Sequence, residues 1–302
     1  MDSKDKTPDN GINIYFFIGR TNPPHLGHIN VLIETIRLSH GSQHNKYPAL
    51  FLLGDGPGGI RTRDNPVEHE LKKQFIVEKL RLNEFTENVD FVIEKMKQPP
   101  NLQVAEFIKK YISEDVTHVT ICQVAGGKDN DGAKHSRIRD DICKKLQELY
   151  KNITFKCVVS ISDVSTSGQD NGAAMSATIV RKKAVEFFNK HHNGEDLKHW
   201  IDTSTETDAA FREWIATFNF YKSPIQLSFE LFKQIILYKD TPPYKPKKSV
   251  RSQSVRPQQV RSHPYERKVN SRSKIVSTDV GGKRYSHRRY FRNRKKYITR
   301  KR

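Results

Sequence analysis

Runs of apolar residues of strand length alternate with segments of helical period along the first 190 residues, and this alternation constrains the fold most strongly. The run 12–18 is continuous rather than alternating, as expected for a parallel strand covered on both faces. In the next segment Leu26, Ile29 and Ile33 recur at steps of three and four, which places them on one helix face. Five such alternations predict a mainly parallel sheet with right-handed crossovers and helices on both faces. The expected strands are 12–18, 49–53, 89–93, 117–124 and 155–161, and the expected helices are 26–38, one opening at 66, 102–112, 138–149 and 177–189.

The helix after the second strand has its own start signal. Asn65 is in place as an N-cap, Pro66 as the first helical residue and Glu68 as the partner that closes a capping box. Two further helices, over 208–218 and 225–238, are expected to form a small annex. Trp200 and Trp214 fall near these helices and are predicted to be core anchors rather than platforms for base stacking.

The positive charge of the chain is confined to its last fifth. The net charge is +19, and residues 241–302 hold 21 Lys and Arg against two acids, whereas the first 240 residues carry 32 groups of each sign. From 241 onward Pro, Ser, Gln, Arg and Lys dominate and apolar periodicity ends, which predicts disorder. We therefore expect a domain over 1–205, a helical annex over 206–240 and a basic tail over 241–302.

Within the tail, Arg, Lys and Tyr interleave between 283 and 297. Cations bind phosphates and tyrosines stack on exposed bases, so the pattern favours a non-specific contact with nucleic acid. Two readings compete with this one: a nuclear-localisation address and an extension that raises solubility.

The three cysteines, Cys122, Cys143 and Cys157, show no paired spacing, and two of them fall in apolar strand-like runs. This predicts reduced core thiols in a reducing compartment, with neither a disulfide nor a zinc framework. The N-terminus lacks an apolar signal segment, and no window approaches the roughly 18 apolar residues of a membrane span. We expect a soluble, cytoplasmic protein without membrane contact, and nuclear entry through the tail stays an alternative. The oligomeric state is left open.

A compact motif follows the first strand, at residues 19–28, and reads GRTNPPHLGH. His25 and His28 lie three residues apart at the opening of a helix, so both imidazoles can face one ligand. A helix N-terminus favours an anion, and Gly27 lets a phosphate chain approach the backbone. The alternative is that both histidines are merely polar residues near a helix start. The preceding strand, the Pro-Pro turn and Gly27 together favour the ligand-binding interpretation.

This motif resembles the HxGH signature of the nucleotidylyltransferase superfamily, which includes adenylyltransferases and cytidylyltransferases. The superfamily has a second signature, approximately Ser-x-Thr-x-x-Arg, on the helix after its fifth strand. Here Ser176, Thr178 and Arg181 stand in that pattern. The resemblance covers roughly residues 12–190. It implies a Rossmann-like, doubly wound parallel sheet of five strands, followed here by C-terminal helices and the basic tail.

The resemblance also implies the roles of individual residues. In that family the two histidines contact the triphosphate, and the Ser, Thr and Arg of the second motif bind its β- and γ-phosphates. The implied cofactor is Mg²⁺ bridging phosphate oxygens, whose protein ligands are not indicated. Lys128 and Asp129 could contact ribose or metal, or lie in a solvated loop. Carried over, the catalytic residues are His25, His28 and Arg181, and the nucleotide-binding residues are Gly19, Arg20, Thr21, Asn22, Gly27, Gly126, Gly127, Lys128, Asp129, Ser176 and Thr178.

Within the family, residues 19–28 and the later Asn-Pro-Val at 65–67 are most similar to the adenylyltransferases of nicotinamide mononucleotide. The implied reaction transfers AMP from ATP to nicotinamide mononucleotide, giving NAD and pyrophosphate. The acceptor phosphate is ionised at neutral pH, so no general base is required. The glycine-rich segment 54–61 and the segment 126–129 depart from the family pattern. A CTP-dependent cytidylyltransferase and a nucleic-acid-binding protein that retains the fold are therefore kept as alternatives.

Overall fold

The computed structural model describes residues 11–41, 47–56, 59–113, 116–126, 132–162, 169–170 and 173–244. The chain divides into two units, Met1–Lys247 and Lys248–Arg302. All of the described residues belong to the first unit. The prediction of disorder for the basic tail therefore falls outside the described residues from position 245 onward.

A five-stranded sheet lies at the centre of the first unit. Its strand order is β3-β2-β1-β4-β5, and every neighbouring pair of strands is parallel. The chain adds β2 and β3 on one side of β1 and then β4 and β5 on the other, which is the doubly wound arrangement of Rossmann-like α/β proteins. The predicted fold class is confirmed. The strands are β1 (Gly11–Gly19), β2 (Ala49–Leu53), β3 (Phe91–Lys95), β4 (His118–Gly126) and β5 (Thr154–Ser162).

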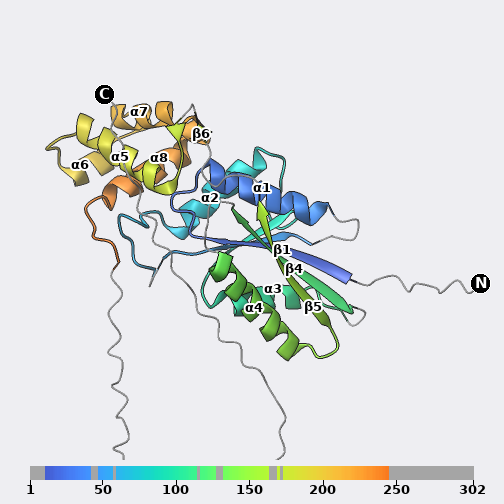
Figure 1. Ribbon diagram of the computed structural model, residues 1–302. Coiled ribbons are helices and arrows are strands. Elements are labelled where there is room, and N and C mark those ends of the chain that lie inside the picture. The colour runs from blue at the N-terminus through green and yellow to red at the C-terminus, as the bar shows by residue number, and fades with distance from the viewer. Residues whose placement is uncertain are drawn as a thin grey trace, which may run out of the picture. The chain divides into compact units, whose positions relative to one another are not determined.

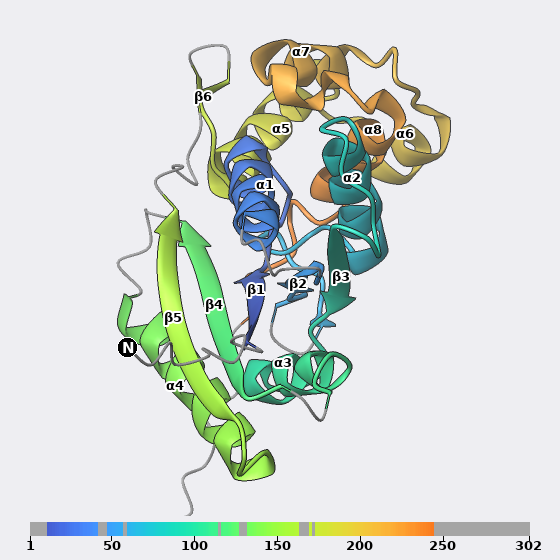
Figure 2. The same cartoon turned by 90° about the vertical axis from the view of Figure 1, so that its right-hand side faces the viewer.

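Helices cover both faces of this sheet: α1 and α2 lie on one face, and α3 and α4 on the other (Figure 1, Figure 2). Alternate residues of β1 enter two separate cores, since Phe16 packs with Phe107 whereas Phe17 packs with Leu32. Burial on both faces explains why the strands read as nearly continuous apolar runs. The four helices are α1 (Leu26–His40), α2 (His69–Arg81), α3 (Pro100–Lys109) and α4 (Gly132–Leu149).

The remaining helices form a second packed group around an aromatic core. Trp200 and Trp214 are buried in it together with Tyr221, so the prediction that the two tryptophans are core anchors is confirmed. Val180 brings α5 into the same core, and the predicted boundary between residues 205 and 206 lies between α6 and α7. Sequence periodicity did not indicate α6 or η2. The group consists of α5 (Ala177–His191), α6 (Leu197–Thr203), α7 (Ala209–Thr217), the 3-10 helix η2 (Asn219–Lys222) and α8 (Ile225–Leu237).

Asn65 does not cap α2, and that prediction is wrong. The helix begins at His69, and its N-cap is Glu68, which makes no side-chain capping hydrogen bond. Asn65 is instead buried, and its side-chain oxygen accepts a hydrogen bond from Nδ2 of Asn22. The side chain of Asn65 therefore forms a tertiary hydrogen bond in place of the local capping bond that its sequence position predicts.

Cys143 on α4 and Cys157 on β5 form a disulfide, so the expectation of three reduced thiols is wrong. Their Cα atoms are 6.0 Å apart, a normal separation for a disulfide. The packing of α4 on β5 brings the two cysteines together. Their separation of 14 residues matches no cysteine motif, so the sequence does not indicate the disulfide. Cys122 is a free, buried thiol. The cysteines as a set therefore do not argue for a reducing compartment.

Two smaller findings complete the fold. A two-stranded antiparallel ribbon of β6 (Gln169–Asp170) and β7 (Ala173–Ala174) precedes α5 and was not predicted. Within the described ranges, none of the helices combines the length and the apolar character that crossing a membrane requires.

Candidate functional site

The turn after β1 lies where the strand order changes direction. β1 ends at Gly19 and has β2 on one side and β4 on the other. In open α/β sheets, ligands bind beyond the carboxyl ends of the strands at such a switch point. Arg20 is exposed, whereas residues 21–25 are buried and the Asn22–Pro23 peptide bond is cis. His25 is the N-cap of α1, so the turn leads directly into this helix.

Thr21 has a backbone conformation that is rare for a β-branched residue. Its φ angle is +43°, in the left-handed region, and its side chain is buried. Such a conformation costs about 1–3 kcal/mol and is found mainly where the surroundings or a ligand site require it. Its Oγ1 atom has no hydrogen-bond partner within the described part of the chain. The turn therefore holds a buried hydroxyl that can bond to a ligand.

The imidazoles of His25 and His28 lie against each other, with ring centroids 3.8 Å apart and an angle of 36° between the ring planes. His25 is 3% exposed, and Nδ1 of His28 is enclosed without a hydrogen-bond partner among the described residues. Enclosure of the ring, and then the positive charge of a protonated His25, lower the pKa of His28 well below 6.5. His28 is therefore neutral at neutral pH, and a bound phosphate would favour its charged form.

The N-terminus of α1 is suited to an anion. His25 makes no side-chain capping hydrogen bond, and the first turn contains no acidic residue. The first N–H groups of a helix lack intrahelical partners and lie at the positive end of the helix dipole. The N–H of His28 donates to the carbonyl of His25 at 2.9 Å, so an anion next to the two imidazoles would interact mainly with the rings and with the positive end of the helix dipole.

The second motif lies against this turn. One guanidinium nitrogen of Arg181 donates to the backbone carbonyl of Asn22, 159 residues away in sequence. The backbone N–H of Leu26 lies 3.4 Å from Sδ of Met175, the residue that precedes the second motif. Two motifs that sequence analysis could only connect by resemblance are thus in direct contact.

The hydroxyl oxygens of Ser176 and Thr178 both accept hydrogen bonds, but neither hydroxyl hydrogen is used as a donor in these contacts. Oγ of Ser176, the N-cap of α5, accepts from the backbone N–H of Ile179 at 3.3 Å. Oγ1 of Thr178 lies 3.4 Å from Arg181, and Asp64 lies 3.9 Å from the same guanidinium. Burial is the main cause that lowers the pKa of Arg181, opposed by Asp64, and the group stays charged. Both hydroxyl hydrogens remain available to a phosphate, because only the oxygens are used as acceptors.

The side chain of Asn22, a predicted nucleotide-binding residue, holds the turn in place. Its Oδ1 accepts from the backbone N–H of Val67 at 3.0 Å, and its Nδ2 donates to the carbonyl of Val67 at 2.9 Å and to Asn65. Nδ2 of Asn65 is buried and has no hydrogen-bond partner among the described residues. Asn65 therefore contributes an unsatisfied donor beside the turn.

The glycines predicted to bind nucleotide lie in different structural settings. A Cβ atom at Gly19 would lie 2.6 Å from the ring of Phe17, so a side chain at this position would require that ring to move. Gly27 is buried in the first turn of α1, and Gly126 ends β4, the strand next to β1. Gly127, Lys128 and Asp129 fall outside the described residues.

Sequence analysis missed a buried charged cluster at the same edge of the sheet. Lys72 is fully buried on α2, and its Nζ donates to the carbonyls of Arg20 at 3.3 Å and Gly54 at 2.8 Å and to Oδ1 of Asp55 at 3.1 Å. Lys95 lies 2.6 Å from the other oxygen of Asp55. Burial raises the pKa of Asp55, but the hydrogen bonds and charges of Lys95 and Lys72 outweigh it and lower that pKa overall. The signal was a lysine within the apolar stripe of α2.

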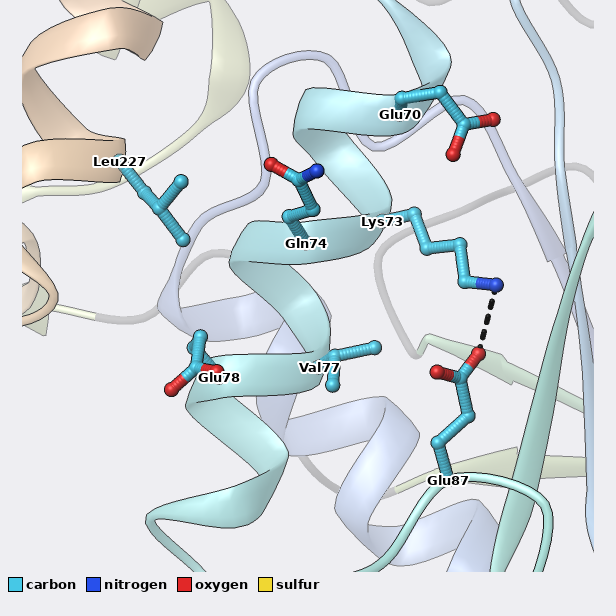
Figure 3. A pocket seen from close by; sticks show the side chains of 7 residues that line it. All are labelled: Glu70, Lys73, Gln74, Val77, Glu78, Glu87 and Leu227. Atoms are coloured by element: carbon cyan, nitrogen blue, oxygen red, sulfur yellow. Dashed lines mark ion pairs between the residues drawn. The ribbon is translucent and has the colours of Figure 1, made fainter.

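Two surface hollows lie beside α2. One of about 680 Å³ borders β3 and α3, and one of about 440 Å³ borders α8. In the smaller hollow Lys73 pairs with Glu87 at 2.9 Å (Figure 3). We assign the candidate site to the turn after β1, because His25, His28 and the guanidinium of Arg181 come together there at the switch point of the sheet. The smaller hollow is lined by Glu70, Lys73, Gln74, Val77, Glu78, Glu87 and Leu227.

Comparisons with known proteins add no assignment: no protein-family model matches the chain, and a search of the curated proteins finds no match.

Proposed function

We propose that this chain is a nucleotidyltransferase that transfers AMP from ATP to a small phosphorylated acceptor, with nicotinamide mononucleotide as the first acceptor to test. The observation that carries the proposal is the contact between the two motifs, in which Arg181 donates to the carbonyl of Asn22. It brings the guanidinium to the same turn that carries His25 and His28. Two imidazoles, one guanidinium and a helix N-terminus at a switch point suit a polyphosphate.

In the proposed reaction, an oxygen of the acceptor phosphate attacks the α-phosphorus of ATP. The bond from that phosphorus to the bridging oxygen breaks, and pyrophosphate leaves with the electron pair. No proton has to be removed from an ionised acceptor phosphate. Catalysis then rests on alignment of the two reactants and on stabilisation of charge on the leaving group. The guanidinium of Arg181 supplies positive charge for this stabilisation, and the imidazole of His28 supplies it in the protonated form that a bound phosphate favours.

Mg²⁺ is part of this proposal. Among the described residues, no group of three or more His, Cys, Asp or Glu side chains could hold a metal ion. Mg²⁺ at nucleotide sites commonly takes most of its ligands from phosphate oxygens and water, which fits a site rich in donors and poor in carboxylates. When bound with the triphosphate, the ion would neutralise part of its negative charge.

Two alternatives lead to different experiments. A cytidylyltransferase would use CTP and an alcohol phosphate at the same turn, because base selection depends on contacts outside the two motifs. A nucleic-acid-binding protein that only retains the fold would need no polar atoms held ready at the turn. The buried hydroxyl of Thr21 and Nδ1 of His28 without partners among the described residues favour an enzyme.

The proposal is tested by pyrophosphate release from the purified chain with Mg²⁺. ATP and CTP are each paired with nicotinamide mononucleotide, glycerol 3-phosphate and phosphopantetheine. We expect release with ATP and nicotinamide mononucleotide, and a fall in kcat/KM of about 10²–10³-fold in His28→Ala, the range for loss of one preorganised donor.

His40→Ala is the matched control. His40 lies on the last turn of the same helix, where it pairs with Asp90 at 3.3 Å, far along α1 from the candidate site. This variant should retain the wild-type rate. Release that is equal in both variants would remove the histidines from the mechanism, and no release with any pair would favour the nucleic-acid-binding alternative.

A further inference from the structure

Tyr221 on η2 reaches the turn after β1 from the C-terminal helices. Its hydroxyl donates to the backbone carbonyl of Pro24 at 2.6 Å, across 197 residues of sequence. The side chain is fully buried. Burial, with the charge of Asp170 adding to it, raises the pKa of Tyr221 well above 10. The hydroxyl therefore keeps its proton and donates throughout the neutral pH range.

Tyr221 is itself held in place by Trp214. The two rings stack, with centroids 4.2 Å apart and an angle of 24° between their planes. The indole N–H of Trp214 donates to the carbonyl of Val180 at 3.2 Å. Val180 is the residue before Arg181 on α5. The aromatic pair thus connects the C-terminal helices to the backbone of the second motif.

Two carbonyls of the turn are therefore fixed by the same group of helices. Arg181 holds the carbonyl of Asn22, and Tyr221 holds the carbonyl of Pro24. The carbonyl of Pro24 belongs to the peptide unit that enters His25, whose own backbone is extended, with φ −142° and ψ 170°. Fixing the orientation of this peptide fixes the direction in which the imidazole of His25 leaves the main chain.

We propose that Tyr221 is a positioning residue of the candidate site, which sets the geometry of the two imidazoles through the carbonyl of Pro24. This inference rests on the proposed function for its catalytic consequence. The hydroxyl lies on a buried aromatic ring that would pack equally well as phenylalanine, so the hydrogen bond is separable from the packing. Alignment errors well below the size of an atom lower the rates of group-transfer enzymes, so a change at this carbonyl should reach the rate.

The test compares Tyr221→Phe with Tyr238→Phe in the full chain. Tyr238 is half-buried at the end of α8 and provides the same chemical change in the same group of helices. The imidazole resonances of His25 and His28 are recorded by NMR on histidine-labelled, ligand-free protein, with His25→Gln and His28→Gln for assignment. Pyrophosphate release and the thermal unfolding midpoint are measured on the same samples.

We expect Tyr221→Phe to shift the His25 and His28 resonances and to lower kcat about tenfold, while KM for the acceptor stays at the wild-type value. The unfolding midpoint should fall by roughly 2–4 °C, as for loss of one neutral hydrogen bond. Tyr238→Phe should change none of these quantities. A merely structural role would lower the midpoint without moving the resonances.

The two proposals fail in distinguishable ways. If the wild-type chain releases no pyrophosphate with any pair, the proposed function fails, and the resonances still decide whether Tyr221 sets the geometry of the histidines. If the resonances and kcat of Tyr221→Phe equal those of the wild type, the positioning role is overturned whatever the activity of the chain.

Discussion

Buried polar side chains concentrate at the carboxyl edge of the sheet, and they fall into two kinds. Asn22 and Lys72 form hydrogen bonds with backbone carbonyls and amides of neighbouring segments, so their polar atoms have partners although they are buried. Thr21, His28 and Asn65 each keep a buried polar atom without a hydrogen-bond partner among the described residues. Because an unsatisfied buried polar atom costs about 1–3 kcal/mol, the second kind points to a ligand.

The enclosed imidazole of His28 makes the free energy of unfolding depend on pH. Its pKa is well below 6.5 in the folded chain, so below pH 6.5 the unfolded chain binds a proton that the folded chain does not. Stability contributed at this site is therefore lost as the pH falls from 6.5. Between pH 7 and pH 5.5 the wild-type chain should lose about 1 kcal/mol more than His28→Gln, measured by urea unfolding. Parallel pH curves for the two proteins would contradict an enclosed, neutral His28.

At the scale of elements, the strands were the easiest features to predict. The residues 49–53 were placed as a strand with the observed bounds, because a strand buried on both faces is apolar at every position. The helix α6 and the helix η2 were missed, since seven and four residues are too short for a helical period to register. The N-cap prediction for Asn65 was wrong for a different reason. The local sequence suits a helix cap, but the side chain accepts a hydrogen bond from Asn22, 43 positions away.

The candidate site was predicted in the same uneven way. The histidines of α1 and the Ser, Thr and Arg of α5 could be found because they form motifs next to recognisable strand and helix boundaries. Tyr221 could not, because it acts on a backbone carbonyl, which leaves no pattern in side-chain types. Lys72 was missed although it leaves one signal, a lysine within the apolar stripe of α2. Nothing in a single sequence relates Tyr221 to Pro24 before the C-terminal helices are packed.

The turn after β1 should depend on Asn22 as an element of structure. In Asn22→Ala, the backbone N–H of Val67 and the side-chain oxygen of Asn65 lose their buried partner. We expect a loss of about 2–3 kcal/mol in the free energy of unfolding, measured with urea, together with weaker ATP binding. Asn83→Ala is the control, since its side chain donates to the carbonyl of Lys79 at an exposed helix end and should cost under about 0.5 kcal/mol. Equal losses in the two variants would show that the contact to Val67 does not hold the turn.

At the scale of the whole molecule, charge is divided between the two functions that we propose. The first 240 residues are electrically balanced, so attraction of the triphosphate depends on the local arrangement of His25, His28 and Arg181 rather than on a general positive field. The tail carries the entire excess charge. Clustered Lys and Arg side chains bind polyanions through their phosphates, and contacts to phosphates do not read sequence. We therefore propose that the tail contacts nucleic acid non-specifically and takes no part in nucleotidyl transfer.

Removal of residues 245–302 separates these two roles. The shortened chain keeps every described helix and strand but loses 21 Lys and Arg, so it should release pyrophosphate at the wild-type rate and lose its affinity for a single-stranded oligonucleotide. For the full chain, the logarithm of the binding constant should fall linearly with the logarithm of the salt concentration, with a slope of about −0.7 for each phosphate contacted. A full-length variant with Gln at Arg284, Arg288, Arg289 and Arg292 should show a smaller slope. Each arginine that is removed takes away one displaced counterion, so an unchanged slope in that variant would place the nucleic-acid contact outside this part of the tail. If the shortened chain still binds the oligonucleotide, the contact lies within the first 244 residues.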